Sequence, residues 1–532
     1  MPEEERRSSR AFLAALLAVT AAVKLCLAWA FPGFLSGDDL EIVATAAKYA
    51  VGLDYEPWRI RCLLHPLLLA FPVVKAGALA GLASPRWLTL LAAVPTAAFS
   101  TLGVWLAYRA ARALDAPETT ARVAALLAAT AWVPFAYGGT QYPRPISSAL
   151  LVGAFVLLVR RGSSSRDAAL AGVLAAAAFA VRWSEGMALI PLTALAWSRG
   201  REATSGGHRS REGTSGGHRI RREATSGGHR THREATSGGH RIRREATSDG
   251  HRSPREAASG RHRRGFFAAL ALLAGFAAGA LLFVGVFDAL TWGAPFASLR
   301  AFLAFLRAPH DAFLPRPFRW YLGLVLQWAG PVVVLLCLFG ARDRRAREPL
   351  VVAAGFVALL SPSPLKALRY VMFAVLLLAV AAAFGWEQLR GRGRAGRAAA
   401  ALCLAISPAL CAERTWHLMR EKSQPAIAAA RFLAARNPRP RSVLLQQQWA
   451  WGERLYLGNG VRIVNVRPGS LDAGVAADAR GVDAAGVYAQ GATPEFESAL
   501  RAEGLMRCRE FAGDGPPVVV YLRSCGAPSS AR

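Results

Sequence analysis

Residues 11–39 read AFLAALLAVTAAVKLCLAWAFPGFLSGDD, an apolar segment followed within a few residues by the acidic pair Asp38 and Asp39. About 20 apolar residues cross the hydrocarbon core of a bilayer, so residues 11–31 predict a transmembrane helix. The segment is longer than the apolar part of a secretory signal and lacks a clear small-residue cleavage site. We therefore expect a retained membrane anchor.

The whole chain combines apolar and basic character. Hydrophobic residues make up 53% of its 532 residues, yet its formal net charge is +29. Segregation of the two along the chain is typical of a polytopic membrane protein. Further apolar stretches lie at residues 63–83, 87–108, 121–138, 146–159, 168–198, 265–290, 321–340, 350–361, 366–386 and 397–412. They predict an all-α bundle with about ten to thirteen crossings.

A polar repeat interrupts the apolar pattern between residues 199 and 264. The dipeptide Arg-Glu starts at residues 201, 211, 222, 233, 244 and 255, usually followed by Ala-Thr-Ser-Gly-Gly-His-Arg or a variant of it. With 17 arginines against 7 acidic residues, the array cannot bury a core, and we expect a disordered cytoplasmic insert. A passive repeat expansion is our main interpretation. Metal binding by the in-step histidines and nonspecific binding to anionic lipid or nucleic acid are the alternatives.

Charge also predicts the topology, because cytoplasmic connections carry the excess of Lys and Arg. The repeat and the basic clusters then share the inner side; these clusters are residues 160–166, 342–347 and 390–397. The outer face receives residues 32–60, 291–319 and 362–366 and the tail from residue 413. This arrangement requires 168–198 to be two short helices with residues 182–186 at the apex. The path from residue 61 to residue 122 stays open, because three arginines disagree with simple alternation: Arg109, Arg112 and Arg122.

The last part of the chain has the composition of a small soluble unit. A helix is predicted around residues 427–435, and strands at 442–445, 462–466 and 518–522. The predicted domains are therefore a catalytic transmembrane domain over residues 1–412, interrupted by the insert at 199–264, and an extracytoplasmic α/β domain over 413–532. Cys508 and Cys525 flank a possible hairpin there, and they could pair in an oxidising compartment.

The acidic pair is the strongest candidate for chemistry. Adjacent carboxylates repel one another, so solvent, a cationic group or a proton-bearing substrate must compensate them. An aspartate there could take a proton from an acceptor hydroxyl while cations stabilise a departing phosphate. The alternative is that Asp38 and Asp39 are ordinary loop residues or a cap for the helix predicted from Leu40.

Other outer segments are dense in cations and aromatic residues, which predicts a cationic, aromatic-lined cleft beside the lipid headgroups. For a single arginine, snorkelling to the interface is the competing explanation. The candidate substrate-binding residues are Glu56, Trp58, Arg61, His65, Arg144, His310, Arg316, Trp320, Lys366 and Arg369.

Several of these segments recur in the order of a known family, over roughly residues 11–386. The chain resembles the GT-C glycosyltransferases of family 22, mannosyltransferases that use dolichyl-phosphate-mannose. Three first-loop elements of that family have counterparts at Ser36-Gly37-Asp38-Asp39, Glu56-Pro57-Trp58 and Ile60-Arg61-Cys62. Later elements resemble Arg144, Asp288 to Trp292-Gly293, Pro295-Phe296, Pro315 to Tyr321 and Pro364 to Tyr370. The first motif here lacks the family's histidine and has Asp in place of its Glu.

The resemblance implies a GT-C fold, an inverting transfer from a polyprenyl-phosphate sugar, and Asp38 as the base. Asp39 would orient the acceptor or hold a cation. We therefore predict an enzyme, a hexosyltransferase that moves a hexose, first of all mannose, to a lipid-linked or outer-face acceptor. The alternatives are transfer of another sugar, such as aminoarabinose, to lipid A, glycan or protein, and a lipid-linked sugar transporter or flippase.

The predicted partners are the lipid-linked donor and acceptor and the membrane lipids, with no nucleic acid. No cofactor or metal is predicted, because a lipid phosphate leaves without a nucleotide. The composition, rich in Ala, Arg and Gly, indicates a bacterial inner-membrane protein with its active site on the periplasmic side.

Overall fold

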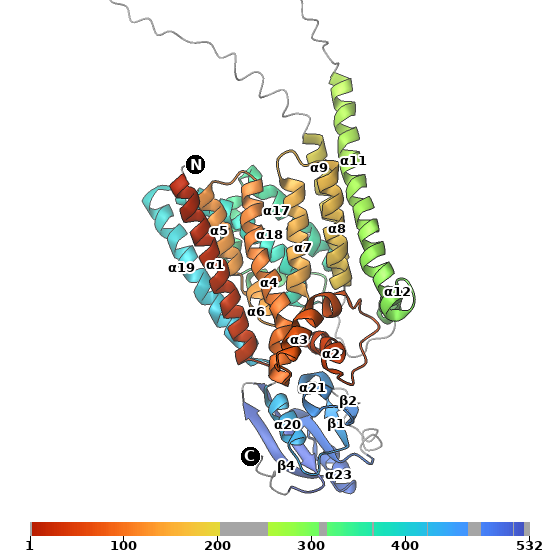
Figure 1. Ribbon diagram of the computed structural model, residues 1–532. Helices are drawn as coiled ribbons and strands as arrows, with labels where there is room; N and C mark the ends of the chain where they lie inside the picture. Colours follow the sequence, from red (N-terminus) through yellow and green to blue (C-terminus); the bar gives the residue numbers. More distant parts are fainter. Residues whose placement is uncertain are drawn as a thin grey trace, which may run out of the picture.

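A computed structural model describes residues 3–202, 254–307, 316–363, 366–422, 424–466, 480–513 and 515–525. A bundle of long helices carries a small domain with a β-sheet at one end (Figure 1). Most of the repeat at 199–264 lies outside the described residues, so its predicted disorder stays a prediction.

The helices of the first half, up to the repeat, are α1 (Glu3–Ala30), α2 (Gly37–Val51), η1 (His65–Ala70), α3 (Phe71–Leu79), α4 (Pro85–Ala113), α5 (Glu118–Ala129), α6 (Trp132–Gly138), α7 (Arg144–Val159), α8 (Ser165–Val181), η2 (Trp183–Ala188) and α9 (Leu189–Glu202). Those that follow are α11 (Pro254–Ala280), η3 (Leu281–Val286), α12 (Phe287–Trp292), α13 (Ala297–Arg307), α14 (Trp320–Gly323), α15 (Val325–Trp328), α16 (Pro331–Gly340), α17 (Arg344–Leu360), η4 (Leu368–Val371), α18 (Met372–Arg390) and α19 (Gly393–Arg420).

Helix α18 forms the centre of the bundle. Its apolar residues are almost all buried, and α5, α7, α16 and α17 pack around it. Small residues allow this close packing: a Cβ added at Gly385 would lie 1.7 Å from the carbonyl oxygen of Leu336. This packing also fixes the N-terminal end of α18, where η4 leads into the helix.

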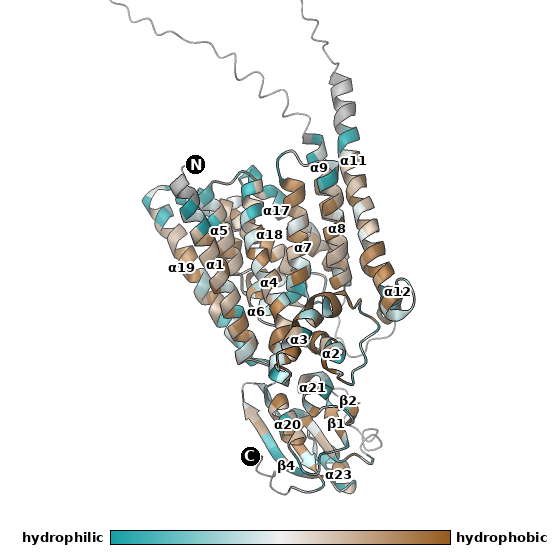
Figure 2. Ribbon diagram, viewed as in Figure 1, coloured by the Kyte–Doolittle hydropathy of each residue, from teal (hydrophilic) through white to brown (hydrophobic). Residues whose placement is uncertain are grey.

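Several helices are suited to a bilayer. Within the described residues, five are long and apolar enough to cross it: Arg7–Ala30, Pro85–Ala113, His262–Trp292, Leu368–Arg390 and Gly393–Ala434. The pair α5 and α6, bent by 58°, would make a sixth. Figure 2 shows apolar residues along the bundle helices and hydrophilic residues at the end remote from the sheet domain. The remaining predicted crossings fall on shorter helices, so the number ten to thirteen stays a prediction.

Some predicted spans have a different form. Residues 63–83 form η1 and α3, which pack against α2 at the sheet-domain end rather than running through the bundle (Figure 1). Residues 321–340 are broken into three short helices. The second break is at Gly330, which has a φ of +86°, and Pro331 begins the third helix. The predicted division of 168–198 into two helices is confirmed, with Arg182 at the break.

The basic loops meet at the end of the bundle remote from the sheet domain. Arg161 pairs with Asp115 at 2.8 Å, and Arg345 donates to the Asp115 carbonyl at 3.4 Å and pairs with Glu387 at 3.4 Å. Because η1 and α3 do not cross, α4 runs from the sheet-domain end to this end and α5 starts there. Three arginines conflicted with alternation: Arg109 and Arg112, in the last turns of α4, and Arg122, near the start of α5. They therefore fall where α4 ends and α5 begins, and Arg112 and Arg122 both pair with Glu118.

The C-terminal domain is a mixed five-stranded sheet in the order β2-β1-β3-β5-β4. Its elements are α20 (Gln424–Ala434), β1 (Ser442–Gln446), η5 (Gln448–Trp451), α21 (Glu453–Leu457), β2 (Arg462–Val466), β3 (Ala484–Tyr488), η6 (Ala489–Gly491), α23 (Pro494–Ala502), β4 (Met506–Gly513) and β5 (Gly515–Leu522). The predicted helix and three strands are confirmed; β3 and β4 were not predicted. A disulfide joins Cys508 and Cys525.

The sheet domain and the first outer loop share one apolar core. Phe34 and Leu40, from the loop and from α2, belong to the same buried cluster as Ile427, Leu445 and Trp451 of the sheet domain. The domain therefore packs directly on the helix whose first turn contains the acidic pair.

Candidate active site at the sheet-domain end of the bundle

The acidic pair lies in the first turn of α2. The preceding Ser36 is extended and makes no capping hydrogen bond with its side chain. Asp39 accepts a hydrogen bond at 2.8 Å from the Leu35 amide, whereas Asp38 makes no such contact with the described backbone and turns toward the bundle. Capping thus accounts for one oxygen of Asp39 and for neither oxygen of Asp38.

Asp38 is held between two arginines from distant parts of the chain. Its Oδ1 accepts from Arg61 of the first loop, and its Oδ2 accepts from Arg182 Nη2 at 2.7 Å. The exposed fraction of each of these three side chains is below 20%. Charge-assisted hydrogen bonds of this kind are stronger than neutral ones, so the pair of guanidinium groups makes a preformed anion site that Asp38 fills.

Asp39 lies deeper and retains an unused oxygen. It is 0% exposed, and its Oδ1 has no hydrogen-bond partner among the described residues. Burial raises the pKa of Asp39 to about 6, although the Leu35 amide and the charges of Lys422 and Arg369 act in the opposite direction. The carboxyl therefore changes its charge close to neutral pH.

Tyr142 connects the arginines of the site. Its hydroxyl oxygen accepts from Arg369 Nε at 2.8 Å and from Arg182 Nη2 at 3.1 Å, and the residue is 0% exposed. Both guanidinium groups also lie over its ring, at 5.0 and 5.5 Å from the centroid. Tyr142 thus fixes the spacing of the two guanidinium groups, although Arg182 precedes the repeat in the sequence and Arg369 follows it.

Arg144 belongs to the support of the site, and the structure does not place it at an accessible surface. Its guanidinium pairs with Glu185 at 2.8 Å, donates to Ser184 at 2.6 Å and stacks 3.9 Å from the Tyr370 ring centroid. Arg144 and Glu185 are each 1% exposed. Burial raises the pKa of Glu185 despite the neighbouring cation. Arg144 therefore holds η2 and Tyr370 in position, and its predicted phosphate contact stays a prediction.

The first outer loop is fixed to α2 by Glu41, one turn after the acidic pair. Glu41 accepts from the Tyr55 hydroxyl and, at 2.7 Å, from the Trp58 amide. The Trp58 ring covers Gly37, where an added Cβ would lie 2.7 Å from it, and Arg61 lies 5.5 Å from the ring centroid. Trp58 and Arg61 are thereby placed beside Asp38.

The other predicted site residues fall in different environments. Lys366, three residues before Arg369, donates to the carbonyls of Ser363 and Arg316 at 2.6 and 2.8 Å. The guanidinium of Arg316 lies over Trp320, 4.4 Å from the ring centroid, and with Lys366 it forms a second cationic group. Glu56 is exposed. His65 is 1% exposed and neither ring nitrogen has a partner within the described chain, so no contact joins it to the acidic pair. His310 lies outside the described residues.

Arg182 and Tyr142 were missed as site residues. The signal for Arg182 was available: it is the charged residue at the break of an apolar segment too long for one span, where the sequence already predicted an apex. For Tyr142 no local pattern predicts the role, because its partners lie 40 and 227 positions away.

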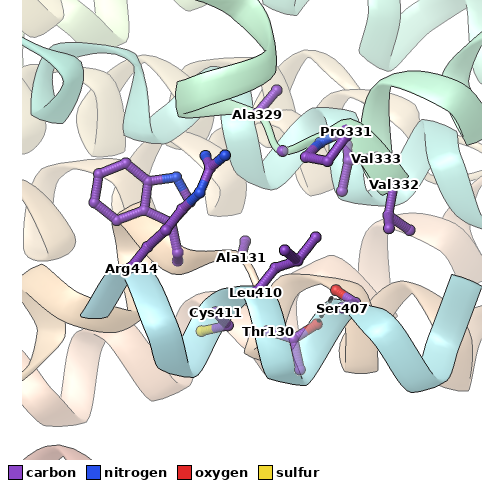
Figure 3. Close-up of a pocket in the computed structure, with 12 residues that line it drawn as sticks. Thr130, Ala131, Ala329, Pro331, Val332, Val333, Ser407, Leu410, Cys411 and Arg414 are labelled. Atoms are coloured by element: carbon purple, nitrogen blue, oxygen red, sulfur yellow. Dashed lines mark hydrogen bonds between the residues drawn. The ribbon is translucent and has the colours of Figure 1, made fainter. Parts of the chain in front are cut away.

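A separate hollow on the bundle does not include the acidic pair. It is small, with a volume of about 20 Å³, and it lies between α19 and the two breaks at Ala131 and Gly330 (Figure 3). Thr130 and Ser407 share a hydrogen bond of 2.8 Å at its floor, and Arg414 and Trp132 both donate to the Gln327 carbonyl. In the described part of the chain no group of three or more His, Cys, Asp or Glu side chains is arranged to hold a metal ion.

No protein-family model and no curated protein sequence matches the chain. The structure is similar to that of ArnT from Cupriavidus metallidurans bound to undecaprenyl phosphate, with a TM-score of 0.53, 12% identity, and coverage of 97% of this chain and 98% of that one. The apo form of the same protein gives a TM-score of 0.52 at 13% identity, with coverage of 96% of this chain and 98% of that one. The archaeal oligosaccharyltransferase AglB from Archaeoglobus fulgidus, in complex with an inhibitory peptide and a dolichol-phosphate, gives a TM-score of 0.49 at 11% identity. The match covers 96% of this chain and 74% of that one.

The chain has a GT-C fold. This confirms the predicted class, an all-α membrane bundle with a small C-terminal α/β domain, and the chain is an integral membrane protein. The similarity extends over almost the whole of both chains, so the sheet domain and the first outer loop belong to the shared architecture.

Proposed function

We propose that the protein is a membrane glycosyltransferase that moves a sugar from a polyprenyl-phosphate donor to an acceptor hydroxyl. The observation that carries the proposal is the acidic pair at the sheet-domain end of a GT-C bundle, with Asp38 lying between Arg61 and Arg182. A carboxylate that can take a proton and cations that can take a phosphate charge are the two groups that this reaction needs.

The reaction balances with these groups. The acceptor oxygen forms a bond to the anomeric carbon, the bond from that carbon to the phosphate oxygen breaks, and Asp38 takes the proton. The lipid phosphate leaves with the bonding electron pair, and Arg61 and Arg182 stabilise its charge. A phosphate entering the anion site competes with Asp38 for both arginines, and Asp38 is then free to act as the base. The ionised Oδ1 of Asp39 accepts a hydrogen bond from the acceptor and orients it.

The donor and its sugar remain part of the proposal. A polyprenyl phosphate is supported by the fold shared with ArnT bound to undecaprenyl phosphate. Mannose is the sugar implied by the resemblance to family 22, and aminoarabinose is the alternative. No cofactor and no metal are proposed, and a lipid-linked or outer-face acceptor agrees with the position of the site at the end of the bundle.

We also propose that the site faces the periplasm. The basic loops gather at the opposite end, as cytoplasmic loops do, and the Cys508–Cys525 disulfide belongs to an oxidising compartment. Labelling of intact cells with a membrane-impermeant maleimide should therefore fail at Cys508 and Cys525 until a reductant is added. Labelling without reduction would contradict the disulfide, and a failure to label even after reduction would contradict the periplasmic position.

The test of the reaction uses purified protein in proteoliposomes with labelled undecaprenyl-phosphate-mannose or undecaprenyl-phosphate-aminoarabinose and lipid acceptors. The wild type should transfer one of the two sugars. Asp38→Asn should lower the rate by about 10²- to 10⁴-fold, the usual contribution of a general base. The control is Asp54→Asn in the same loop, whose side chain is 63% exposed and should be dispensable. Equal rates for Asp38→Asn and wild type would overturn the assignment.

A further inference from the structure

Lys422 is a buried cation that the reaction above does not use. It lies in the short link between α19 and α20, where the bundle continues into the sheet domain, and it is 0% exposed. Its Nζ donates to the Phe31 carbonyl at 2.6 Å. A buried lysine is costly unless something compensates its charge, and so Lys422 requires an explanation.

Lys422 and Asp39 hold the two ends of the same segment. This segment, residues 31–36, links α1 to α2 and leads directly to the acidic pair. Lys422 binds its first carbonyl, at Phe31, while Asp39 accepts from the amide of Leu35 at 2.8 Å. The charge of Lys422 also acts on Asp39, whose Oδ1 has no hydrogen-bond partner in the described chain.

Apolar contacts hold the segment against the bundle and the sheet domain. The Phe31 ring meets Trp416 of α19 edge to face, with centroids 5.7 Å apart. Phe34 is 0% exposed and lies so near Gly452 that an added Cβ there would be 3.2 Å from its ring. The segment is therefore in contact with α19, with the α19–α20 link and with the sheet domain.

We propose that Lys422 is a positioning residue for the acidic pair and that, through it, the sheet domain holds the first turn of α2 in its active geometry. The inference rests on the proposed function for its catalytic meaning, but the contacts themselves can be tested without substrate. The charged and titratable groups that face Asp39 are Asp38 on its own helix, Tyr137 of α6, Arg369 and Lys422. Lys422 is the one of these that belongs to the link with the sheet domain.

The first test is hydrogen–deuterium exchange of the whole protein in nanodiscs. Lys422→Met should speed exchange of the amides at residues 33–39 by at least tenfold, whereas Lys422→Arg should stay close to wild type. Lys75→Met is the matched control. Lys75, like Lys422, donates to a backbone carbonyl, but its partner is Ala50 at the far end of α2 from Asp39. Unchanged exchange in Lys422→Met would overturn the proposal.

A double-mutant cycle measures the coupling directly. The apparent melting temperature should fall in Lys422→Met. In the double variant Lys422→Met with Asp39→Asn it should fall by less than the sum of the two single effects, because the carboxylate that Lys422 compensates is then absent. Additive effects would overturn the proposed coupling of Lys422 to Asp39. If Lys422→Met alone does not accumulate, recovery of folded protein in the double variant supports the coupling, and continued loss contradicts it.

Activity gives the third readout. In Lys422→Met the acid limb of the pH–rate profile should move to higher pH, because the cation that favours the charged form of Asp39 is gone; in Lys75→Met and Lys422→Arg it should not move. If the rate falls but the acid limb of the pH–rate profile does not move, Lys422 has only a structural role. If the wild type transfers no sugar at all, the proposed function fails, while exchange and the double-mutant cycle still decide the role of Lys422.

Discussion

Arg369 and Arg182 donate to the same acceptor, the hydroxyl oxygen of Tyr142, at 2.8 and 3.1 Å. Arg182 also binds Asp38 at 2.7 Å, so one buried tyrosine links η4, just before α18, to the acidic pair in the first turn of α2 through a single arginine. The cationic groups of the site are therefore fixed relative to one another before any substrate enters.

The hydroxyl of Tyr142 should matter more than its ring. In Tyr142→Phe both arginines lose an acceptor, and a hydrogen bond to a charged group contributes about 1.5–3 kcal/mol. We expect kcat/KM to fall by about 10- to 100-fold with little change in the amount of folded protein, since about 1.4 kcal/mol corresponds to a tenfold change. Steady-state kinetics of Tyr142→Phe in proteoliposomes check this. A loss confined to expression level would contradict it.

Arg182 should be a strong contributor to turnover. Arg182→Gln removes one of the two cations that receive the leaving phosphate, and loss of one such group costs about 10²- to 10³-fold in kcat. Arg414→Gln is the control, because Arg414 is another arginine of the bundle, lies outside the site, and contacts the Leu326 and Gln327 carbonyls and the Trp132 ring. Equal losses in the two variants would show that Arg182 has no special part.

The rate should depend on pH through Asp39. Its raised pKa of about 6 means that the carboxyl is mostly ionised at pH 7 and mostly protonated at pH 5. Because the ionised form orients the acceptor, the rate should fall as the pH drops through about 6, by about tenfold for each further unit. Asp39→Asn should be slower at pH 7 and should lack this limb. A pH–rate profile of Asp39→Asn that retains the wild-type limb would assign it to another group.

The repeat should be dispensable for transfer. The backbones of α9 and α11 touch before the repeat and after it, since a Cβ added at Gly200 would lie 2.7 Å from the Cα atom of Gly265. A short Gly/Ser linker in place of residues 203–258 can therefore join the two helices. We expect this variant to retain the wild-type rate within about twofold. If the variant folds but its transfer rate falls by more than tenfold, the repeat takes part in function.

The fold could be predicted further than the site. Apolar periodicity was sufficient for the bundle, the divided segment at Arg182 and the C-terminal α/β domain, because these depend on local composition. The acidic pair and Arg61 were recognised because they lie in one short loop. The pairs Asp38–Arg182, Arg144–Glu185 and Lys422–Phe31 join residues 144, 41 and 391 positions apart, and only the packing of the helices brings them together.

Glu41 has a consequence for how substrates gain entry. Since it binds both Tyr55 and Trp58, the stretch from Gly37 to Arg61 is tied together as one unit. Asp38 and Arg61 would travel with that unit, whereas Arg182 and Arg369 stay on the bundle. A movement of that unit relative to the bundle would therefore part Asp38 from Arg182 but not from Arg61, so the donor phosphate itself must separate Asp38 from Arg61.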